Sequence, residues 1–322
     1  MVNSHSDMDA WSRFWRQGHF TTFGQFFEGG YAGPVKAWLD SLAETLSPDG
    51  ERLKTLELCC GNGSCLPFLL SLERPFDYVG VDAAAVALPD TLKAAVSRTG
   101  STARVFSNTP IEALPDYVQS LSMCLSIYGM EYAPLDVALP GVLSKMSSGA
   151  KLFALMHHKD SVVSKMSARA VSEYHEGDIR KIEKALTTIH QTLTRLGSVT
   201  ALKTDEKAEE ARKFMNGMGN KYVKDANMET GNAFMADHVL AALGFFKTLG
   251  AKASAREQFI ADLAAEAKAA KERHQQMLSV AKNKDDMSAL SDAMARMGWS
   301  EVSFNELTNK EDIIGWTLAA TA

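Results

Sequence analysis

The chain has few cysteines and no long apolar run. Four cysteines stand among 322 residues, and three of them fall within residues 59–65. Cysteines so close together cannot link distant parts of a chain of this size, so a disulfide scaffold is excluded and a reducing compartment is expected. The longest apolar runs, such as residues 239–246, fall far short of the roughly 20 residues that cross a bilayer. We therefore expect no membrane-spanning segment.

The chain also has fewer basic residues than acidic residues. The chain has 34 Lys and Arg against 39 Asp and Glu, a net charge of -5, which disfavours nucleic acid and anionic membranes as partners. The first residues lack the basic and apolar regions of a secretory signal, so a cytoplasmic location is expected. Hydrophobic residues make up 46% and charged residues 23%, which is typical of a folded globular chain.

Strand-like and helix-like segments alternate in the first half. Turn-bounded apolar runs predict strands, and stretches with helical spacing predict helices between them. The predicted strands are residues 53–58, 78–82, 103–106, 121–127 and 151–157, and the predicted helices are residues 65–72, 84–96 and 137–146. This alternation indicates parallel strands joined by helical crossovers. The expected fold class is α/β, a Rossmann-like, doubly wound and mostly parallel sheet.

The second half changes character after Asp160. Ala, Lys, Glu and Met dominate there, and residues 256–282 carry an apolar stripe with helical spacing. Residues 239–246 are apolar on all sides, which suits a helix buried between other elements or in a subunit interface. Two strand-like runs at the end, 299–307 and 313–321, predict an antiparallel pair that completes the sheet. The helical block is then an insertion within the sheet domain.

Four regions follow from these patterns. They are an N-terminal helical and aromatic segment (1–50), a Rossmann-like core (51–160), a large helical insertion (161–297) and a final strand pair (298–322).

The most informative motif follows the first predicted strand. Glu57 ends that strand, and Gly61, Asn62 and Gly63 form a turn in which glycine allows the backbone to approach a ligand closely. Asp82 ends the second strand, where such folds commonly bind ribose hydroxyls. The dinucleotide fingerprint G-x-G-x-x-G is incomplete because Leu66 replaces the third glycine. A pyrophosphate site is therefore disfavoured.

Together these motifs resemble the class I S-adenosylmethionine-dependent methyltransferases. The resemblance implies that Glu57 lies close to the amino acid end of the cofactor, that Gly61 and Gly63 pass beneath it and that Asp82 holds its ribose. It covers residues 53–160 and 298–322. The implied cofactor is S-adenosylmethionine, and the implied product is S-adenosylhomocysteine.

Further segments extend the resemblance. By position, Asn108 or Thr109 binds the adenine amino group, and residues 125–132 line the methyl-transfer site. The remaining cofactor residues expected beside these motifs are Asn62, Ala83 and Ser126. Cys59 stands where the family commonly has glycine, which leaves the path of the loop open.

Aromatic residues are dense near the N-terminus. Residues 11–31 hold Trp11, Trp15, Phe20, Phe23 and Tyr31 among other aromatics. Such a cluster suits either helix packing or a lid over cofactor and acceptor, because aromatic faces attract the cationic sulfonium. The expected lid and substrate residues are Trp15, Phe20, Thr22, Phe23, Tyr31 and Tyr132.

Candidate catalytic residues follow the fourth and fifth strands. His157 and His158 close the fifth strand at the ligand-binding edge, and alternation sends one of them toward the site and the other away. A structural histidine that bonds the following turn is the alternative for each. If the acceptor is an amine or hydroxyl, His157, His158 or Glu131 would remove its proton. A thioether acceptor would need no base, and Tyr128 and Tyr132 could stabilise its cationic product.

The leading interpretation is methyl transfer to the N, O or S atom of a small molecule under a helical roof. No metal is expected, because the cysteines and histidines lack the spacing of a structural zinc site. The insertion could also form a homodimer. A nicotinamide-dependent dehydrogenase and a catalytically silent cofactor-binding interaction protein are the alternatives.

Overall fold

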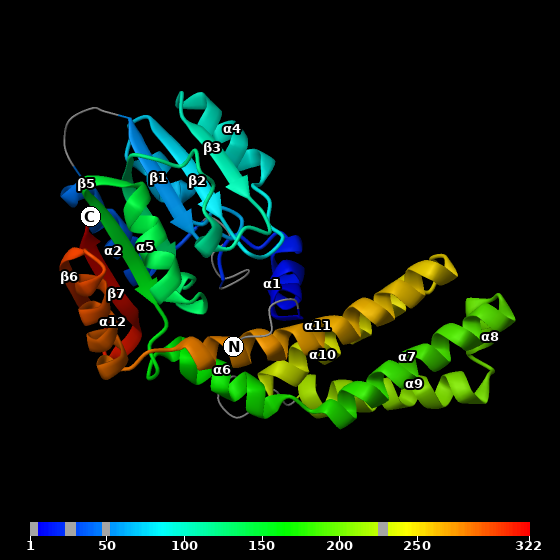
Figure 1. The fold of residues 1–322 in the computed structure, drawn as a ribbon. Helices are drawn as coiled ribbons and strands as arrows, with labels where there is room; N and C mark the ends of the chain where they lie inside the picture. Colours follow the sequence, from blue (N-terminus) through cyan, green and yellow to red (C-terminus); the bar gives the residue numbers. More distant parts are fainter. Residues whose placement is uncertain (1–5, 23–29, 47–51, 225–230) are drawn as a thin grey trace. The chain divides into compact units, whose positions relative to one another are not determined.

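The computed structural model describes residues 6–22, 30–46, 52–224 and 231–322. Their contacts divide the chain into two compact units (Figure 1). The sheet unit comprises Met1–Met166 and Gln276–Ala322, and the helical unit comprises Ser167–Gln275. No helix in these described stretches combines the length and the apolar character that crossing a membrane requires.

The sheet unit contains a seven-stranded sheet in the order β3-β2-β1-β4-β5-β7-β6. The strands are β1 (Leu53–Leu58), β2 (Phe76–Val81), β3 (Thr102–Phe106), β4 (Leu121–Ile127), β5 (Met146–Met156), β6 (Ser300–Asn309) and β7 (Asp312–Thr321). The first five run parallel, whereas β7 is antiparallel to both β5 and β6. The expected fold class is confirmed, including the antiparallel last strand.

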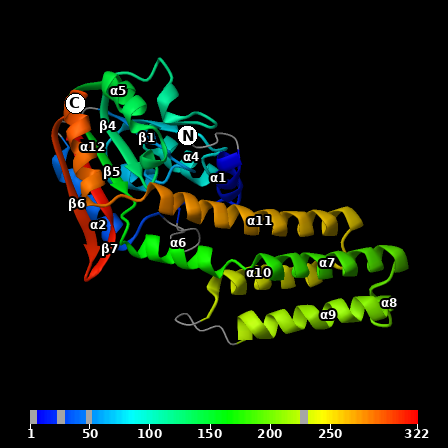
Figure 2. The ribbon, with the colours of Figure 1, turned by 60° about the horizontal axis from the view of Figure 1, so that its bottom comes forward.

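Helices cover both faces of this sheet (Figure 2). The apolar core on one face includes residues of α2 (Gly33–Leu42), α3 (Leu66–Ser71) and α4 (Asp90–Arg98). The core on the other face includes residues of α5 (Leu135–Lys145) and α12 (Lys284–Arg296). Short turns of helix at η2 (Ala43–Thr45), η3 (Ile111–Ala113) and η4 (Met130–Tyr132) and the N-terminal α1 (Ser6–Arg16) complete the unit.

The helix predicted over residues 84–96 begins later than expected. The helix α4 starts at Asp90 because Pro89 precedes it with an extended conformation, and a proline disfavours helical geometry in the residue before it. The preceding segment instead hydrogen-bonds to other parts of the unit. The amide of Ala85 donates to the Ser12 hydroxyl, and the amide of Ala87 donates to Asn62 Oδ1.

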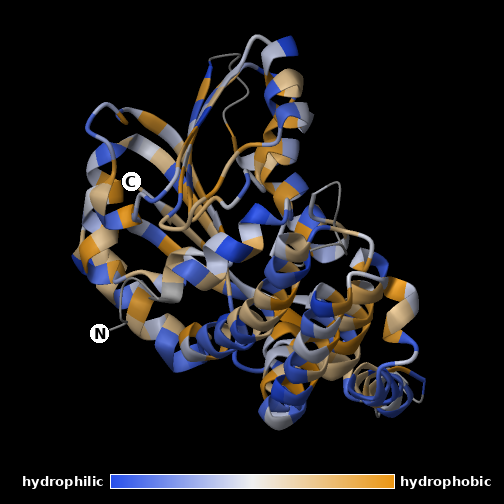
Figure 3. Ribbon diagram, turned by 90° about the vertical axis from the view of Figure 1, so that its right-hand side faces the viewer, coloured by the Kyte–Doolittle hydropathy of each residue, from blue (hydrophilic) through white to orange (hydrophobic). Residues whose placement is uncertain are grey.

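The helical unit has its own apolar core. Its helices are α7 (Glu176–Leu196), α8 (Val199–Leu202), α9 (Glu206–Gly219) and α10 (Ala233–Leu243), with the short turns η5 (Asn220–Lys224) and η6 (Gly244–Thr248). The helices α6 (Val162–Glu173) and α11 (Ala253–Val280) each belong partly to both units. Figure 3 shows hydrophobic and hydrophilic residues mixed along these helices. Their apolar residues build a buried cluster around Ile182, Leu186 and Met215.

One expectation about this unit is wrong in part. Val239 and Phe245 are fully buried, but Leu240 between them is 52% exposed. The segment 239–246 is therefore buried on one side only, because α10 presents its other side to solvent. The role of the insertion 161–297 as a substrate cap stays a prediction.

Candidate active site

The glycine turn lies at the C-terminal end of β1, beside the point where the strand order reverses from β1–β2–β3 to β4. Ligands of doubly wound sheets bind at such a point. Gly61 and Gly63 adopt positive φ angles of 51° and 89°. A Cβ on Gly61 would come within 2.5 Å of the Trp15 ring, and one on Gly63 within 2.6 Å of Leu88. Both positions therefore require glycine for conformation and for space.

The backbone at Cys59 has the left-handed conformation that a glycine would adopt easily. Its φ angle is 53°, in the left-handed region, which costs a non-glycine residue about 1 to 2 kcal/mol. A Cβ on Gly129 would lie 2.5 Å from the Cys59 Cβ, so the absence of a side chain at Gly129 makes room for the cysteine.

The buried side chain of Glu57 fixes the position of this loop through hydrogen bonds. Its carboxylate accepts hydrogen bonds from the Ser64 hydroxyl (2.8 Å), the Cys65 amide (3.3 Å) and the Tyr78 hydroxyl (2.6 Å). Burial raises the pKa of Glu57 to about 7, against the opposing effect of these hydrogen bonds. The structure thus shows a loop-positioning role, which the sequence motif did not reveal, and a contact with the cofactor stays a prediction.

Asp82 reaches the same loop from β2. Its Oδ2 accepts a hydrogen bond from the Gly61 amide and its Oδ1 accepts one from the Ala84 amide, both at 2.8 Å. Burial raises the pKa of Asp82 to about 6, although both amide hydrogen bonds oppose the rise. The carboxylate and the glycine turn are therefore in direct contact, which the sequence motifs did not indicate.

The N-terminal segment is fastened to the turn. The Asn62 side chain donates hydrogen bonds to the carbonyls of Trp15 (3.0 Å) and His19 (2.8 Å). Trp15 covers Gly61, and its ring stacks with that of Trp11 at a centroid distance of 6.4 Å. Trp11 also makes an edge contact with Tyr132 at 5.7 Å. The aromatic segment thus contacts the predicted site in two places. Trp15 contacts the glycine turn, and Trp11 contacts Tyr132.

The other predicted lid residues lie in different surroundings. Tyr31 is buried in the core on the α2 and α3 face, and its role over the cofactor stays a prediction. Phe20 and Thr22 are half-buried, and Phe20 lies against Gly30. Phe23 lies outside the described residues.

Three predicted cofactor residues line the turns beside Asp82. Ala83 is half-buried, and Thr109 donates its amide to the Asp82 carbonyl at 2.7 Å. Asn108 is exposed, has a φ angle of 53° and donates its amide to the Ala84 carbonyl. Ser126, by contrast, is fully buried, and its hydroxyl bridges the Leu58 carbonyl and the Met130 amide. Ser126 therefore ties the end of β1 to the segment after β4.

The segment after β4 brings Glu131 and two tyrosines to the end of β5. Glu131 is 5% exposed, and its Oε1 accepts a hydrogen bond from the His157 amide at 2.8 Å. The Tyr132 hydroxyl lies 3.3 Å from His157 Nε2. The Tyr128 ring stacks on His157 at 4.7 Å, and its hydroxyl donates to the Ile314 carbonyl. Tyr128 thus supports His157 from the β7 side.

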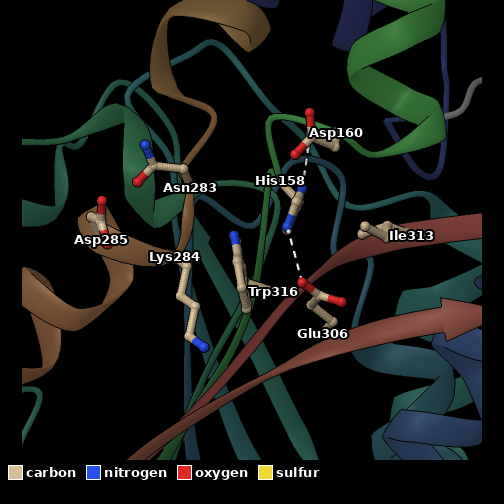
Figure 4. A pocket seen from close by; sticks show the side chains of 8 residues that line it. All are labelled: His158, Asp160, Asn283, Lys284, Asp285, Glu306, Ile313 and Trp316. Atoms are coloured by element: carbon tan, nitrogen blue, oxygen red, sulfur yellow. Dashed lines mark hydrogen bonds and ion pairs between the residues drawn. The ribbon is translucent and has the colours of Figure 1, made fainter.

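The two histidines face opposite sides of the sheet, as strand alternation predicts. His157 lies among Tyr128, Glu131 and Tyr132, and burial lowers its pKa to about 3. His158 Nδ1 accepts a hydrogen bond from the Asp160 amide, and Nε2 lies 3.5 Å from Glu306 (Figure 4). His158 is therefore the structural histidine of the pair, bonded to the turn that follows it.

Two hollows adjoin this edge of the sheet. One, of about 300 Å³, lies beside His158 and Trp316 (Figure 4). The larger, of about 590 Å³, has mostly apolar walls and is bounded by Trp15, Asn62 and residues 85–90. The larger hollow therefore adjoins the glycine turn.

Carboxylates converge on the loop around Cys59. The pKa of its thiol is raised well above the usual value, first by burial and then by the negative charges of Asp82, Glu131 and Glu112. A cationic ligand would relieve this accumulation of negative charge. The glycine turn, the Asp82 carboxylate and this charge fit a sulfonium cofactor with a ribose. Within the described ranges no cluster of side chains suits a metal ion.

Gly129 belongs to the segment 125–132 that was expected to line the methyl-transfer site, and the structure shows that it packs on Cys59. The sequence did not single out Lys282 as part of this site. Lys282 joins the end of β5 through its backbone, which bonds to both His157 and Lys159. Its charge favours the ionised form of Glu131. Only the return of the chain from the helical block brings Lys282 there.

No protein-family model and no curated protein matches this chain. Its fold is similar to that of solved structures named as methyltransferases. A candidate O-methyltransferase from Nostoc punctiforme PCC 73102 is 10% identical over 97% of this chain and 60% of its own, with a TM-score of 0.41. A SAM-dependent methyltransferase from Thermotoga maritima is 11% identical over 98% and 99%, with a TM-score of 0.40.

The plantazolicin methyltransferase, solved with SAH, is 16% identical over 50% of this chain and 62% of its own, with a TM-score of 0.32. The chain thus spans 60% of the length of the Nostoc protein and 62% of this one. All three are named as methyltransferases. At such TM-scores the likeness says nothing about the substrate or the reaction of this chain.

Proposed function

We propose that this protein is a S-adenosylmethionine-dependent methyltransferase that acts on a small molecule. The observation that carries the proposal is the contact between the Gly61 amide and the Asp82 carboxylate at the strand-order reversal. Asp82 would hold the ribose hydroxyls, because a carboxylate oxygen with one amide donor retains capacity for a second hydrogen bond. Gly61 and Gly63 would leave the backbone open to the methionine part of the cofactor.

When bound, the cofactor supplies an electrophilic methyl group on a positively charged sulfur. The chain's own part is to bind, to orient and to exclude water, because an in-line displacement requires alignment more than covalent help. Trp11, Trp15 and Tyr132 would provide the apolar and aromatic wall, and aromatic faces attract a sulfonium. The four carboxylates near Cys59, those of Asp82, Glu131, Glu112 and Glu57, supply a matching negative potential.

Calorimetric titration with S-adenosylmethionine, S-adenosylhomocysteine and NAD tests the proposal. We expect the first two to bind and NAD to bind far more weakly. Asp82→Ala should weaken S-adenosylmethionine binding by about 1 to 3 kcal/mol, since the ribose donors lose a charged acceptor. Asp40→Ala is the matched control, because Asp40 pairs with Lys36 on the exposed side of α2. Equal affinities in wild type and Asp82→Ala, or tighter binding of NAD, would overturn the proposal.

A further inference from the structure

Two buried polar atoms near the ends of β4 and β5 have no hydrogen-bond partner among the described residues. They are Glu131 Oε2 and His157 Nδ1. The second polar atom of each side chain is engaged: Glu131 Oε1 accepts from the His157 amide, and His157 Nε2 contacts the Tyr132 hydroxyl. A buried carboxylate oxygen without a partner carries an energetic cost that demands an explanation.

Charged and aromatic groups surround this carboxylate. Burial raises the pKa of Glu131 to about 7, against the opposing effects of the backbone amides of Glu131, His157 and Gly129 and of the Lys282 charge. Tyr132 and Cys59 feel its charge. The Tyr132 ring in turn contacts Trp11 and His157. A buried carboxylate among aromatic rings is the arrangement that recognises an organic cation with N–H donors.

We propose that the methyl acceptor is an amine, and that Glu131 Oε2 holds its N–H and takes its proton. This inference rests on the proposed function and names the acceptor class of the same site. His157 Nδ1 would orient the amine as a second polar contact. The neutral imidazole is held between the Tyr128 ring and the Tyr132 hydroxyl.

The acceptor, the cofactor and Glu131 together account for every proton and electron pair in the transfer. An alkylammonium acceptor passes one proton to Glu131 Oε2 and becomes a neutral amine with a free lone pair. The nitrogen forms a bond to the methyl carbon while the carbon–sulfur bond breaks and leaves its electron pair on sulfur. The methylated product leaves as an ammonium ion, and Glu131 returns its proton to solvent.

The two histidines are less suited to take this proton. Burial lowers the pKa of His157 to about 3, so its protonated form is strongly disfavoured. His158 points to Glu306 and Trp316 on the other face, and its Nδ1 already accepts from the Asp160 amide. By contrast, the pKa of Glu131 near neutrality suits a base that must both take and release a proton at pH 7.

The test follows the ionisation of Glu131 in the full-length protein saturated with S-adenosylhomocysteine, which cannot donate a methyl group. Infrared difference spectra between wild type and Glu131→Gln report the carboxyl band of Glu131 across a pH titration. Methylamine hydrochloride is the probe, because it is the smallest alkylamine. Sodium chloride and methanol at equal concentrations are the comparison probes.

We expect methylammonium to lower the apparent pKa of Glu131 by about 1 to 3 units, since an adjacent opposite charge favours the carboxylate. Sodium chloride and methanol should leave it within a few tenths of a unit. An unchanged pKa with methylamine, or an equal shift with methanol, would overturn the amine assignment. Failure of S-adenosylhomocysteine to bind in the same samples would instead overturn the proposed function.

Two controls keep the experiment decisive. Glu131→Gln retains an amide oxygen that can accept from the His157 amide, so we expect it to fold. If that variant is unstable, Glu131→Met, which has a similar length and no carboxyl group, replaces it as the reference. Glu311→Gln, in the exposed turn between β6 and β7, should leave both the carboxyl titration and its response to methylamine unchanged.

Discussion

Two groups of carboxylates in this protein are held in opposite states. At the C-terminal edge of the sheet, burial raises the pKa values of Glu57, Asp82 and Glu131. In the helical unit, hydrogen bonds from Lys221 and Tyr222 lower the pKa of Asp178 to about 2. The first arrangement costs folding free energy at neutral pH and the second contributes to it. Groups held in an unfavourable state gather where ligands bind, which supports our proposal that the chemistry takes place at this edge of the sheet.

Substitution of Gly61 in the glycine turn should reduce cofactor affinity more than any other change proposed below. Gly61→Ala would have to adopt a φ angle of 51° and would push its Cβ into the Trp15 ring. Backbone strain and overpacking together cost about 2 to 5 kcal/mol. We expect S-adenosylmethionine affinity to fall by more than tenfold, as measured by calorimetry.

Gly100→Ala is the matched control for that variant. Gly100 also has a positive φ angle, 71°, but nothing lies within 4 Å of a Cβ placed there. It should lose stability by about 1 to 2 kcal/mol from backbone strain alone, with cofactor affinity unchanged. If the two variants bound the cofactor equally well, the turn would not be the binding site.

Cofactor affinity should depend on pH through Asp82. The folded pKa of Asp82 is raised to about 6, so the carboxylate that accepts ribose hydrogen bonds is lost as pH falls below that value. We expect the dissociation constant to rise by up to tenfold per pH unit below pH 6 and to be flat above pH 7. Asp82→Asn should abolish this dependence. A dependence that persists in Asp82→Asn would assign it to another group.

A substitution in the helical unit should affect stability and spare cofactor binding. Asp178 pairs with Lys221 at 2.7 Å and accepts from the Tyr222 hydroxyl at 2.6 Å. Asp178→Asn should lower the free energy of unfolding by about 1 kcal/mol in urea titrations. Because the folded pKa is lowered, this contribution is present above pH 4 and disappears as pH falls toward 2. A loss of cofactor affinity in this variant would contradict the division of roles.

The smallest expected effect concerns α1. Ser12 and the carbonyl of Trp15 bond to Ala85 and Asn62, which flank the proposed cofactor position. We expect S-adenosylhomocysteine to slow hydrogen exchange several-fold in the amides of α1 and to leave α9 unchanged. Unchanged exchange in α1 would favour plain packing of the aromatic segment over a lid.

Much of the sheet unit could be predicted because its signals are local. Apolar runs bounded by turns located five parallel strands, and alternation along β5 predicted that His157 and His158 face opposite sides. The glycine turn and Asp82 were expected at the ends of neighbouring parallel strands, and the structure adds the hydrogen bond between them. These features depend on neighbours in sequence and on strand direction alone.

Other features depend on contacts between distant segments. The engagement of Glu57 depends on Tyr78 in the next strand. The place of Lys282 beside the end of β5 depends on the return of the chain after the helical block. The 52% exposure of Leu240 depends on which side of α10 meets the rest of its unit. Periodicity in the sequence carries none of this information.

A crystal structure with S-adenosylhomocysteine bound tests the central claim most directly. The account predicts the ribose hydroxyls within about 2.6 to 3.2 Å of the Asp82 carboxylate. It also predicts the amino acid part of the ligand over Gly61 and the sulfur facing Glu131 and Tyr132. A ligand seated instead in the hollow beside His158 and Trp316, with the Asp82 carboxylate bonded only to Gly61 and Ala84, would contradict it.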